Sequence, residues 1–170
     1  QSNIAIFSVG SDGTDGPTDA AGGYVDGDSA IAESSSKFAS NKAQMGAALF
    51  IDNTATLNGT TFEANEGVAT EGAASAGAAI AGEYGDIVLN GVTITGNTAN
   101  NGAAIYDGKK LAVTINGATV TDNENGIIIS GGSLSIAGDV TVKNNEKYDV
   151  YMSSGKLIKI VGELGEESEI

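Results

Sequence analysis

The sequence lacks cysteine, histidine, arginine and tryptophan, and it has a single proline among 170 residues. These absences exclude a disulfide scaffold, thiolate zinc sites, and Ser-His-Asp or Cys-His catalysis. No apolar run approaches the roughly 20 residues that a membrane-spanning helix requires, so we expect no membrane insertion. The chain starts at Gln1 with neither a methionine nor a signal peptide, which leads us to expect a mature or excised piece of a protein.

Positive charge and aromatic residues are also scarce. Eight basic residues, all lysine, face 22 acidic residues, and the net charge is -14. Because so few cations cannot neutralise a phosphate backbone or an anionic surface, we expect neither nucleic acid nor anionic membrane as a partner. With 5% aromatic residues and 25 glycines, the core must be thin and built from small side chains.

Three short marks recur along the chain in a fixed order. The first is an apolar residue followed three positions later by asparagine, at Asn41, Asn65, Asn97, Asn123 and Asn145. The second is Gly-x-x-aliphatic, beginning at Gly46, Gly77, Gly102 and Gly126. The third is an aliphatic residue two positions before a glycine, at Gly59, Gly91, Gly117, Gly138 and Gly162. Such ordered repetition predicts a solenoid with units of 21 to 32 residues.

Within each unit apolar and polar residues alternate, which is the period of a β-strand. We predict an all-β protein, a single-stranded right-handed parallel β-helix of about five to six coils with three short strands each. The whole chain, 1–170, is one domain: 1–35 an irregular first coil with an acidic loop, 36–162 regular coils, and 163–170 an acidic cap or linker. Ile115 and Ile160 are among the residues predicted to point inward.

The glycines and asparagines of the marks are predicted to lie at the corners between strands. Both residue types tolerate the left-handed backbone conformation that sharp turns need. Stacked asparagines also hydrogen-bond amide to amide in other β structures. We therefore predict a structural ladder of the five repeated asparagines, Asn41, Asn65, Asn97, Asn123 and Asn145.

Two of the marks together resemble a known family. Gly-Ala-Ala-aliphatic stands at 46–49, 77–80 and 102–105, and it alternates with Phe-x-x-Asn at 38–41 and 62–65. Over about residues 36–162 this pattern resembles the paired repeats of polymorphic outer-membrane proteins and related surface adhesins. The resemblance implies a right-handed β-helix displayed outside the cell with adhesive or structural work, and it implies no catalytic residues.

Two segments break the rhythm at the same corner, residues 10–21 and 66–76. Insertions at one corner of a solenoid project from one face, which is often the binding face. The candidate binding rim comprises Asp12, Asp15, Asp19, Glu66 and Glu71. The alternative is that these are solvated loops without a ligand.

The N-terminal acidic run, Asp12, Asp15 and Asp19, is a weak calcium candidate, because carboxylates and glycine turns suit that ion. Its spacing matches neither an EF-hand loop nor the calcium-roll repeat. We otherwise expect no cofactor.

Many parallel β-helices cleave acidic polysaccharides, so an enzyme is the main rival class. Two carboxylates suffice for glycoside hydrolysis, and the nearest candidates are Asp122 with Glu124 and Asp86 with Asp107. We expect none of them to be paired with the arginine, lysine, histidine or aromatic platform that usually holds a sugar. Two Thr-x-Thr ranks are likewise too few for an ice-binding plane. We expect no catalysis, with polysaccharide binding or cleavage as an alternative.

The sequence therefore predicts a non-enzymatic, extracellular structural or adhesive module of a bacterial adhesin or stalk. Its partner would be a protein or glycan at a cell surface. Neither end of the sequence has a strong capping segment of the kind that typically covers the end of a solenoid. An open β edge can pair with a strand of another chain. The alternative is therefore a filament subunit that stacks end to end on itself.

Overall fold

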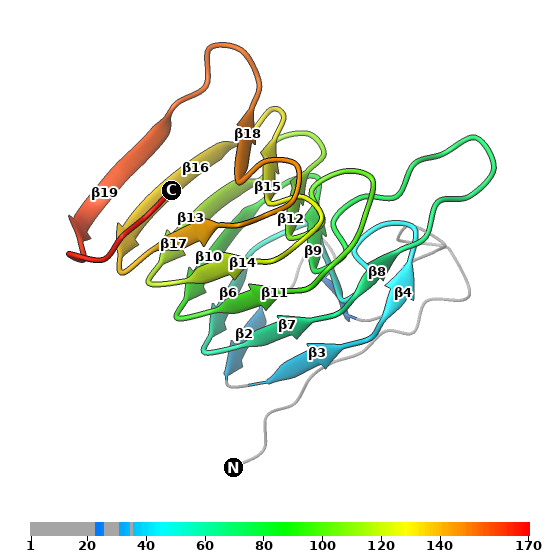
Figure 1. The fold of residues 1–170 in the computed structure, drawn as a ribbon, viewed down its shortest axis with the longest axis horizontal. Helices are drawn as coiled ribbons and strands as arrows, with labels where there is room; N and C mark the ends of the chain where they lie inside the picture. The colour runs from blue at the N-terminus through cyan, green and yellow to red at the C-terminus, as the bar shows by residue number, and fades with distance from the viewer. Residues whose placement is uncertain (1–22, 26–30, 35) are drawn as a thin grey trace.

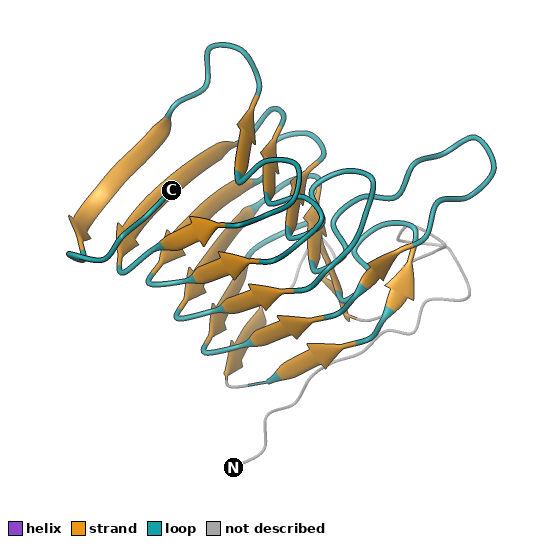
Figure 2. Ribbon diagram, viewed as in Figure 1, coloured by secondary structure: helices purple, strands orange, loops and turns teal. Residues whose placement is uncertain are grey.

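The structure is a computed structural model that describes residues 23–25, 31–34 and 36–170, with side chains from residue 36 onward. All regular elements of these ranges are β-strands, and they wind into a stack of coils (Figure 1, Figure 2). No helix in the described ranges is long and apolar enough to cross a membrane.

Three parallel sheets run along the stack. Sheet A contains β1 (Gly23–Val25), β5 (Leu49–Ile51), β9 (Ile80–Gly82), β12 (Ile105–Asp107), β15 (Ile127–Ile129) and β18 (Val150–Met152). Sheet B contains β2 (Ile31–Ser34), β6 (Ala55–Asn58), β10 (Asp86–Asn90), β13 (Ala112–Asn116), β16 (Ser133–Gly138) and β19 (Ile158–Leu164). Sheet C contains β3 (Lys37–Ala39), β7 (Thr61–Glu63), β11 (Thr93–Thr95), β14 (Thr119–Thr121) and β17 (Thr141–Lys143).

Each coil passes through sheets B, C and A in turn, and every strand pairs in parallel with its equivalent in the next coil. Five such turns are complete before β19 begins a sixth. A fourth, two-stranded sheet joins β4 (Lys42–Ala43) to β8 (Glu66–Gly67) beside the first two turns. The parallel β-helix predicted from the repeated marks is confirmed.

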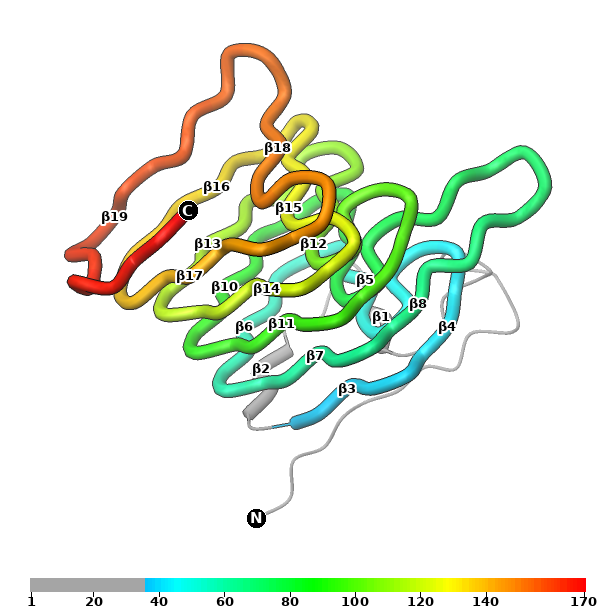
Figure 3. Tube along the Cα trace, in the orientation of Figure 1, coloured from blue at the N-terminus to red at the C-terminus, as the bar shows by residue number. Residues whose placement is uncertain are grey.

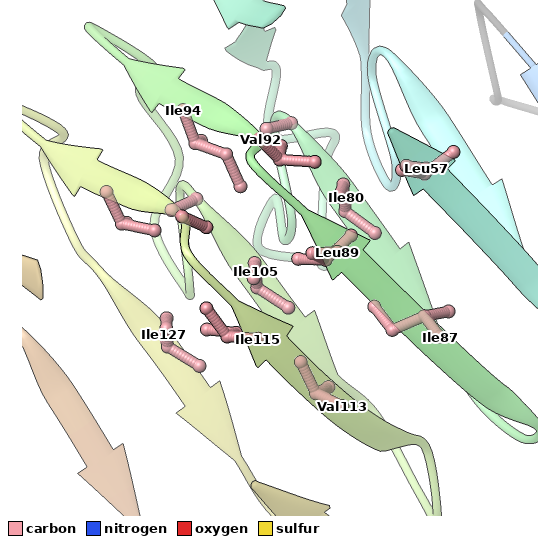
Figure 4. Packing of buried hydrophobic residues seen from close by; sticks show 14 of the residues in the cluster. Leu57, Ile80, Ile87, Leu89, Val92, Ile94, Ile105, Val113, Ile115 and Ile127 are labelled. Atoms are coloured by element: carbon pink, nitrogen blue, oxygen red, sulfur yellow. The ribbon is translucent and has the colours of Figure 1, made fainter. Parts of the chain in front are cut away.

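The core is a set of aliphatic columns that follow the strand register. Leu89 pairs with Leu57 on one side and with Ile115 on the other, and all three are at most 1% exposed. Figure 4 shows how the side chains of sheets A, B and C meet in the narrow interior. Phe38 and Phe62 stack at 5.0 Å between ring centroids at the N-terminal end of the column in sheet C.

In the last coil the residues predicted to point inward are not fully buried. Ile158 is only partly buried and Ile160 is 65% exposed, although both continue a core column. No coil in the described structure lies over β19, so its inward face has nothing to pack against. Gly162, predicted to mark a corner, lies inside β19, whereas Gly138 turns the chain with φ 70°.

The acidic C-terminal segment, predicted as a cap or linker over 163–170, is divided between the end of a strand and a cap. Glu163 and Leu164 belong to β19. The chain then returns so that Glu169 pairs with the edge of β17, where its N–H donates to Val140 O and its carbonyl accepts from Val142 N–H, both at 2.8 Å. In Figure 3 this last segment lies beside β17. Residues 165–169 therefore cap sheet C.

One buried polar atom lies in a column of otherwise apolar side chains. Thr60 is 0% exposed, and its Oγ1 has no hydrogen-bond partner among the residues that the structure describes. In the following coils the equivalent positions hold Val92, Ala118 and Val140, all 0% exposed. The threonine hydroxyl therefore sits in an apolar column.

We expect Thr60→Val to stabilise the protein. The replacement keeps the shape and removes a buried hydroxyl without a partner, which costs about 1–3 kcal/mol. Urea denaturation should show a higher midpoint with an unchanged slope, and Thr61→Val, on the outer face, should leave the midpoint nearly where it was. A lower midpoint for Thr60→Val would mean that the hydroxyl has a partner after all.

Candidate functional site

The repeated asparagines form one continuous hydrogen-bonded column. In each coil the backbone N–H and the Nδ2 of the asparagine donate to Oδ1 of the asparagine in the next coil. The Asn97 to Asn123 pair shows this at 3.0 Å and 2.9 Å. The same pattern joins the other ladder residues, Asn41, Asn65, Asn97, Asn123 and Asn145. These are the five residues for which the sequence predicted a corner ladder.

The column ends at a different residue type. The N–H and Nδ2 of Asn145 donate to Oδ1 of Asp149, at 3.0 Å and 2.8 Å, four residues further along the same coil. A carboxylate accepts and does not donate, so it can finish the column without needing another coil. Asp149 is therefore a terminator that the repeat pattern did not reveal.

The left-handed corner conformation belongs to the residue before each ladder asparagine. These residues have φ between 52° and 65°, and they are Ser40, Ala64, Gly96, Asp122 and Asn144. The ladder asparagines are needed for their side chains, so the idea that they supply left-handed backbone is wrong. It holds for the glycines of the third mark, such as Gly59 and Gly91, with φ 60° and 59°.

We expect Ala64→Gly to stabilise the protein by about 0.5–1 kcal/mol. Alanine at φ 52° carries a left-handed penalty of roughly 1–2 kcal/mol, partly offset by the greater freedom that glycine has when unfolded. Chemical denaturation of both forms would measure the difference. Ala39→Gly, an exposed β3 position with ordinary backbone, should instead lose about 0.5–1 kcal/mol. Equal losses in both variants would contradict the strain at Ala64.

Asp107 lies at the corner between sheets A and B and is 0% exposed. Its Oδ1 accepts from the N–H groups of Lys109 and Leu111 at 3.0 Å and 2.9 Å. Its Oδ2 accepts from the next coil, from the N–H groups of Ser130, Gly131 and Gly132 at 3.1, 2.9 and 2.6 Å. Five backbone N–H groups thus donate to one carboxylate. Because these donors come from two successive coils, the Asp107 side chain holds the two coils together.

The two glycines of this corner allow the backbone to approach closely. A Cβ on Gly131 would lie 1.7 Å from Lys109 O, and one on Gly132 would lie 1.8 Å from Leu111 O. From the last coil, Lys156 Nζ then donates to the carbonyls of Gly131 and Gly132 at 2.6 and 3.0 Å. The corner is closed on both sides by protein.

The members of the two candidate carboxylate pairs lie in different surroundings. Asp107 is buried and fully hydrogen-bonded, while Asp86 is exposed at the start of β10. Glu124 forms an ion pair with Lys147 at 2.7 Å, and Asp122 occupies the left-handed corner with φ 58°. Asp107 and Asp122 thus contribute to the geometry of the corners.

Lysine–glutamate pairs join neighbouring coils on the outer surface. Lys37 pairs with Glu63 and Lys42 with Glu66, both at 2.5 Å, and Lys143 pairs with Glu169 at 2.7 Å. Lys109 pairs with Glu83 in the same way. Hydrogen bonds to Glu83, Glu169 and Glu124 raise the pKa of Lys109, Lys143 and Lys147, respectively, above the ordinary lysine value. Exposed pairs of this kind add little stability each, but they use most of the cations of the described chain.

The predicted binding rim is only partly within the described residues. Asp12, Asp15 and Asp19, which are also the calcium candidates, lie outside them. Glu66 was expected in the loop, but it belongs to β8, where pairing with β4 brings it to Lys42. No group of three or more acidic residues in the described ranges could hold a metal ion.

Glu71 lies at the tip of an ordered loop. Residues 68–74 are exposed and project from the corner between sheets C and A, as Figure 3 shows after β8. Thr70 and Ala73 exchange two backbone hydrogen bonds of 3.1 Å, and Gly72 turns the chain with φ 84°. The loop is a short hairpin with Glu71 at its turn.

The base of the hairpin is fixed by residues that the sequence did not single out. Ser75 donates from its N–H and Oγ to Asn100 Oδ1 at 3.1 and 3.0 Å, and Asn100 N–H donates back to Ser75 Oγ at 3.1 Å. Asn125, one coil further on, donates to Ala99 O at 2.6 Å. Each contact occurs once, so no repeat pointed to it.

The MOFRL family is matched over residues 1–63 of the chain. Most of the coils, from β8 onward, lie outside that segment. No curated protein and no solved structure matches the chain.

Proposed function

We propose that this chain is a non-enzymatic structural or adhesive module of an extracellular bacterial adhesin or stalk, of the kind that its repeats resemble. The observation that carries the proposal is the hairpin of residues 68–74, which stands out from an otherwise regular solenoid on a hydrogen-bonded base. A rigid scaffold with one projecting loop is a common arrangement for recognition.

The roles of the polar residues support a scaffold. The ladder asparagines and Asp107 bond within the corners, and the lysines of the ion pairs join one coil to the next. These polar side chains are therefore engaged in contacts that hold the coils together. We infer from this that the coils perform no catalysis and that recognition belongs to the loop.

The hairpin offers a small, specific set of contacts. Glu71 provides one exposed carboxylate, Val68 is 42% exposed, and Thr70 provides a hydroxyl. A carboxylate accepts hydrogen bonds from the hydroxyl groups of a glycan or from the amides and lysines of a protein. The partner proposed is therefore a neutral glycan or a protein at a cell surface, outside the cell.

The geometry permits a clean deletion of the loop. Residues 66–76 span 11 positions between Asn65 and Gly77, and the equivalent corner in the next coil, 98–101, spans four. Removing 68–74 takes seven residues from eleven and leaves four. The deletion joins Gly67 to Ser75. These two residues already lie close together, because a Cβ built on Gly67 would be 2.9 Å from Ser75 Cβ.

We expect the deletion to abolish binding and to leave the melting temperature unchanged or slightly raised. The intact chain and the variant would be compared on a glycan array and on whole host cells, with Tyr84→Ser, an exposed change near another corner, as the control. Binding that is equal in the intact chain and the deletion variant would contradict a recognition role for the hairpin.

A further inference from the structure

Exposed apolar side chains concentrate in the last coil. Seven large hydrophobic residues are exposed in the described chain, and five lie within residues 151–170. These five are Tyr151, Leu157, Ile160, Val161 and Ile170, with exposed fractions of 53, 79, 65, 58 and 49%. Ile160 and Val161 lie in β19, the strand at the end of the core in sheet B, and exposed apolar residues at such a place indicate a contact surface.

The C-terminal end of the stack is capped in only one sheet. Glu169 covers β17 in sheet C, and Asp149 ends the asparagine column. In sheet B, β19 pairs with β16 on one side and with no strand of the described chain on the other. With seven residues β19 is the longest strand, and a long unpaired edge is a template for another strand.

The sequence of β19 is self-complementary about its centre. Lys159 and Glu163 lie two residues before and after Val161. In an antiparallel pair centred on Val161, Lys159 of each copy lies directly opposite Glu163 of the other. Opposite charges facing each other across two strands stabilise the pair.

The apolar residues of β19 also favour an antiparallel pair centred on Val161. β19 pairs with β16 from Ile158 to Ile160 and again at Leu164, with a register shift between them. At both paired ends the even-numbered residues continue the core columns, and alternation along the open edge then places Lys159, Val161 and Glu163 on the outer face. Ile158 would face Leu164, and both already pack partly against the core. Ile160 would face Gly162, which leaves room for its side chain. The sheet B core would thus run on into a second molecule.

Two-fold registers centred two residues away, at Lys159 or Glu163, lack this agreement. A centre at Lys159 places two lysines opposite each other, and a centre at Glu163 places two glutamates opposite each other. Like charges directly opposite destabilise a strand pair. A two-fold contact also closes on itself, so it yields a dimer and no filament.

We propose that β19 pairs antiparallel with β19 of a second copy about a two-fold axis at Val161, joining two solenoids tail to tail. This inference does not depend on the function proposed for the hairpin. The contact surface is the open edge of β19, its occupant is a second copy of the chain, and the register is centred at Val161.

Charge exchange tests the partner and the pairing. Sedimentation equilibrium over a concentration series should show a dimer for the unmodified chain. K159E and E163K should each weaken dimerisation by about tenfold, because each creates two like-charged pairs. A 1:1 mixture of the two variants restores both opposite-charge pairs and should dimerise like the unmodified chain, as should the double variant K159E/E163K.

Cross-linking tests the register. The chain has no cysteine, so V161C with a short bifunctional maleimide should give a covalent dimer, while V68C, on the distant hairpin, should not. Circular dichroism would confirm that each variant is folded. A monomer at all concentrations, filaments that lengthen with concentration, or a K159E and E163K mixture that stays monomeric would overturn the proposal.

Discussion

Replacing Asp107 by alanine is expected to lower the free energy of unfolding by about 3–5 kcal/mol. The carboxylate is 0% exposed and accepts five backbone hydrogen bonds from two coils. Alanine would leave these donors buried without an acceptor. Since small proteins are stable by only roughly 5–15 kcal/mol, this loss would remove a large part of the stability of the protein.

Asp107→Asn separates the effect of charge from that of shape. The amide keeps the volume, but its NH₂ group donates, and it would face N–H groups that also donate. We expect a loss of about 2–4 kcal/mol, smaller than for alanine, because one oxygen still accepts.

Urea denaturation followed by circular dichroism would measure both variants. Asp86→Asn is the matched control, since Asp86 is exposed at the start of β10 and its change should stay within about 0.5 kcal/mol. A loss below about 1 kcal/mol for Asp107→Ala would show that water can reach the corner and satisfy the freed donors.

The fold was predictable because each coil repeats the same physical problem. A strand such as β10 must bury Ile87 and Leu89 and then turn, so a similar apolar pair and the same aliphatic-x-Gly mark recur from coil to coil. The ladder asparagines could be found for the same reason. Each mark alone is a weak signal, but the marks recur in the same order, so together they predict which residues of successive coils lie side by side.

Features that occur once could not be predicted in this way. Asp107, Asp149 and the Ser75–Asn100 contact each occur at a single corner. Asp107 and Ser75 have partners in a neighbouring coil, whereas Asp149 binds Asn145 of its own coil. The exposure of Ile160 has a related cause, because a periodic pattern does not say where the stack ends.

The candidate site was predicted in position and not in detail. The longer interval between Asn65 and Gly77 located the hairpin that carries Glu71. Glu66 was assigned to the same loop, because the pairing of β8 with β4 depends on a contact between coils that spacing alone does not show.

Ile115→Asp is expected to unfold the protein. Ile115 is 0% exposed, and in sheet B it pairs with Leu89 in one coil and Ile136 in the next. Truncating a buried isoleucine costs about 2–5 kcal/mol by itself, and an unpaired carboxylate in the same place costs several more. The sum is comparable to the total stability of a domain of this size.

The neighbouring residue provides the control, because one step along β13 reverses the face. Thr114→Asp points away from the core and should shift the melting temperature by only a few degrees. Ile115→Asp should show no cooperative thermal transition near neutral pH. Burial favours the protonated form of a carboxyl group, so any structure that this variant regains should appear as the pH falls and disappear as it rises. A normal transition at neutral pH in Ile115→Asp would mean that the side chain reaches solvent, and the inward register of sheet B would then be wrong.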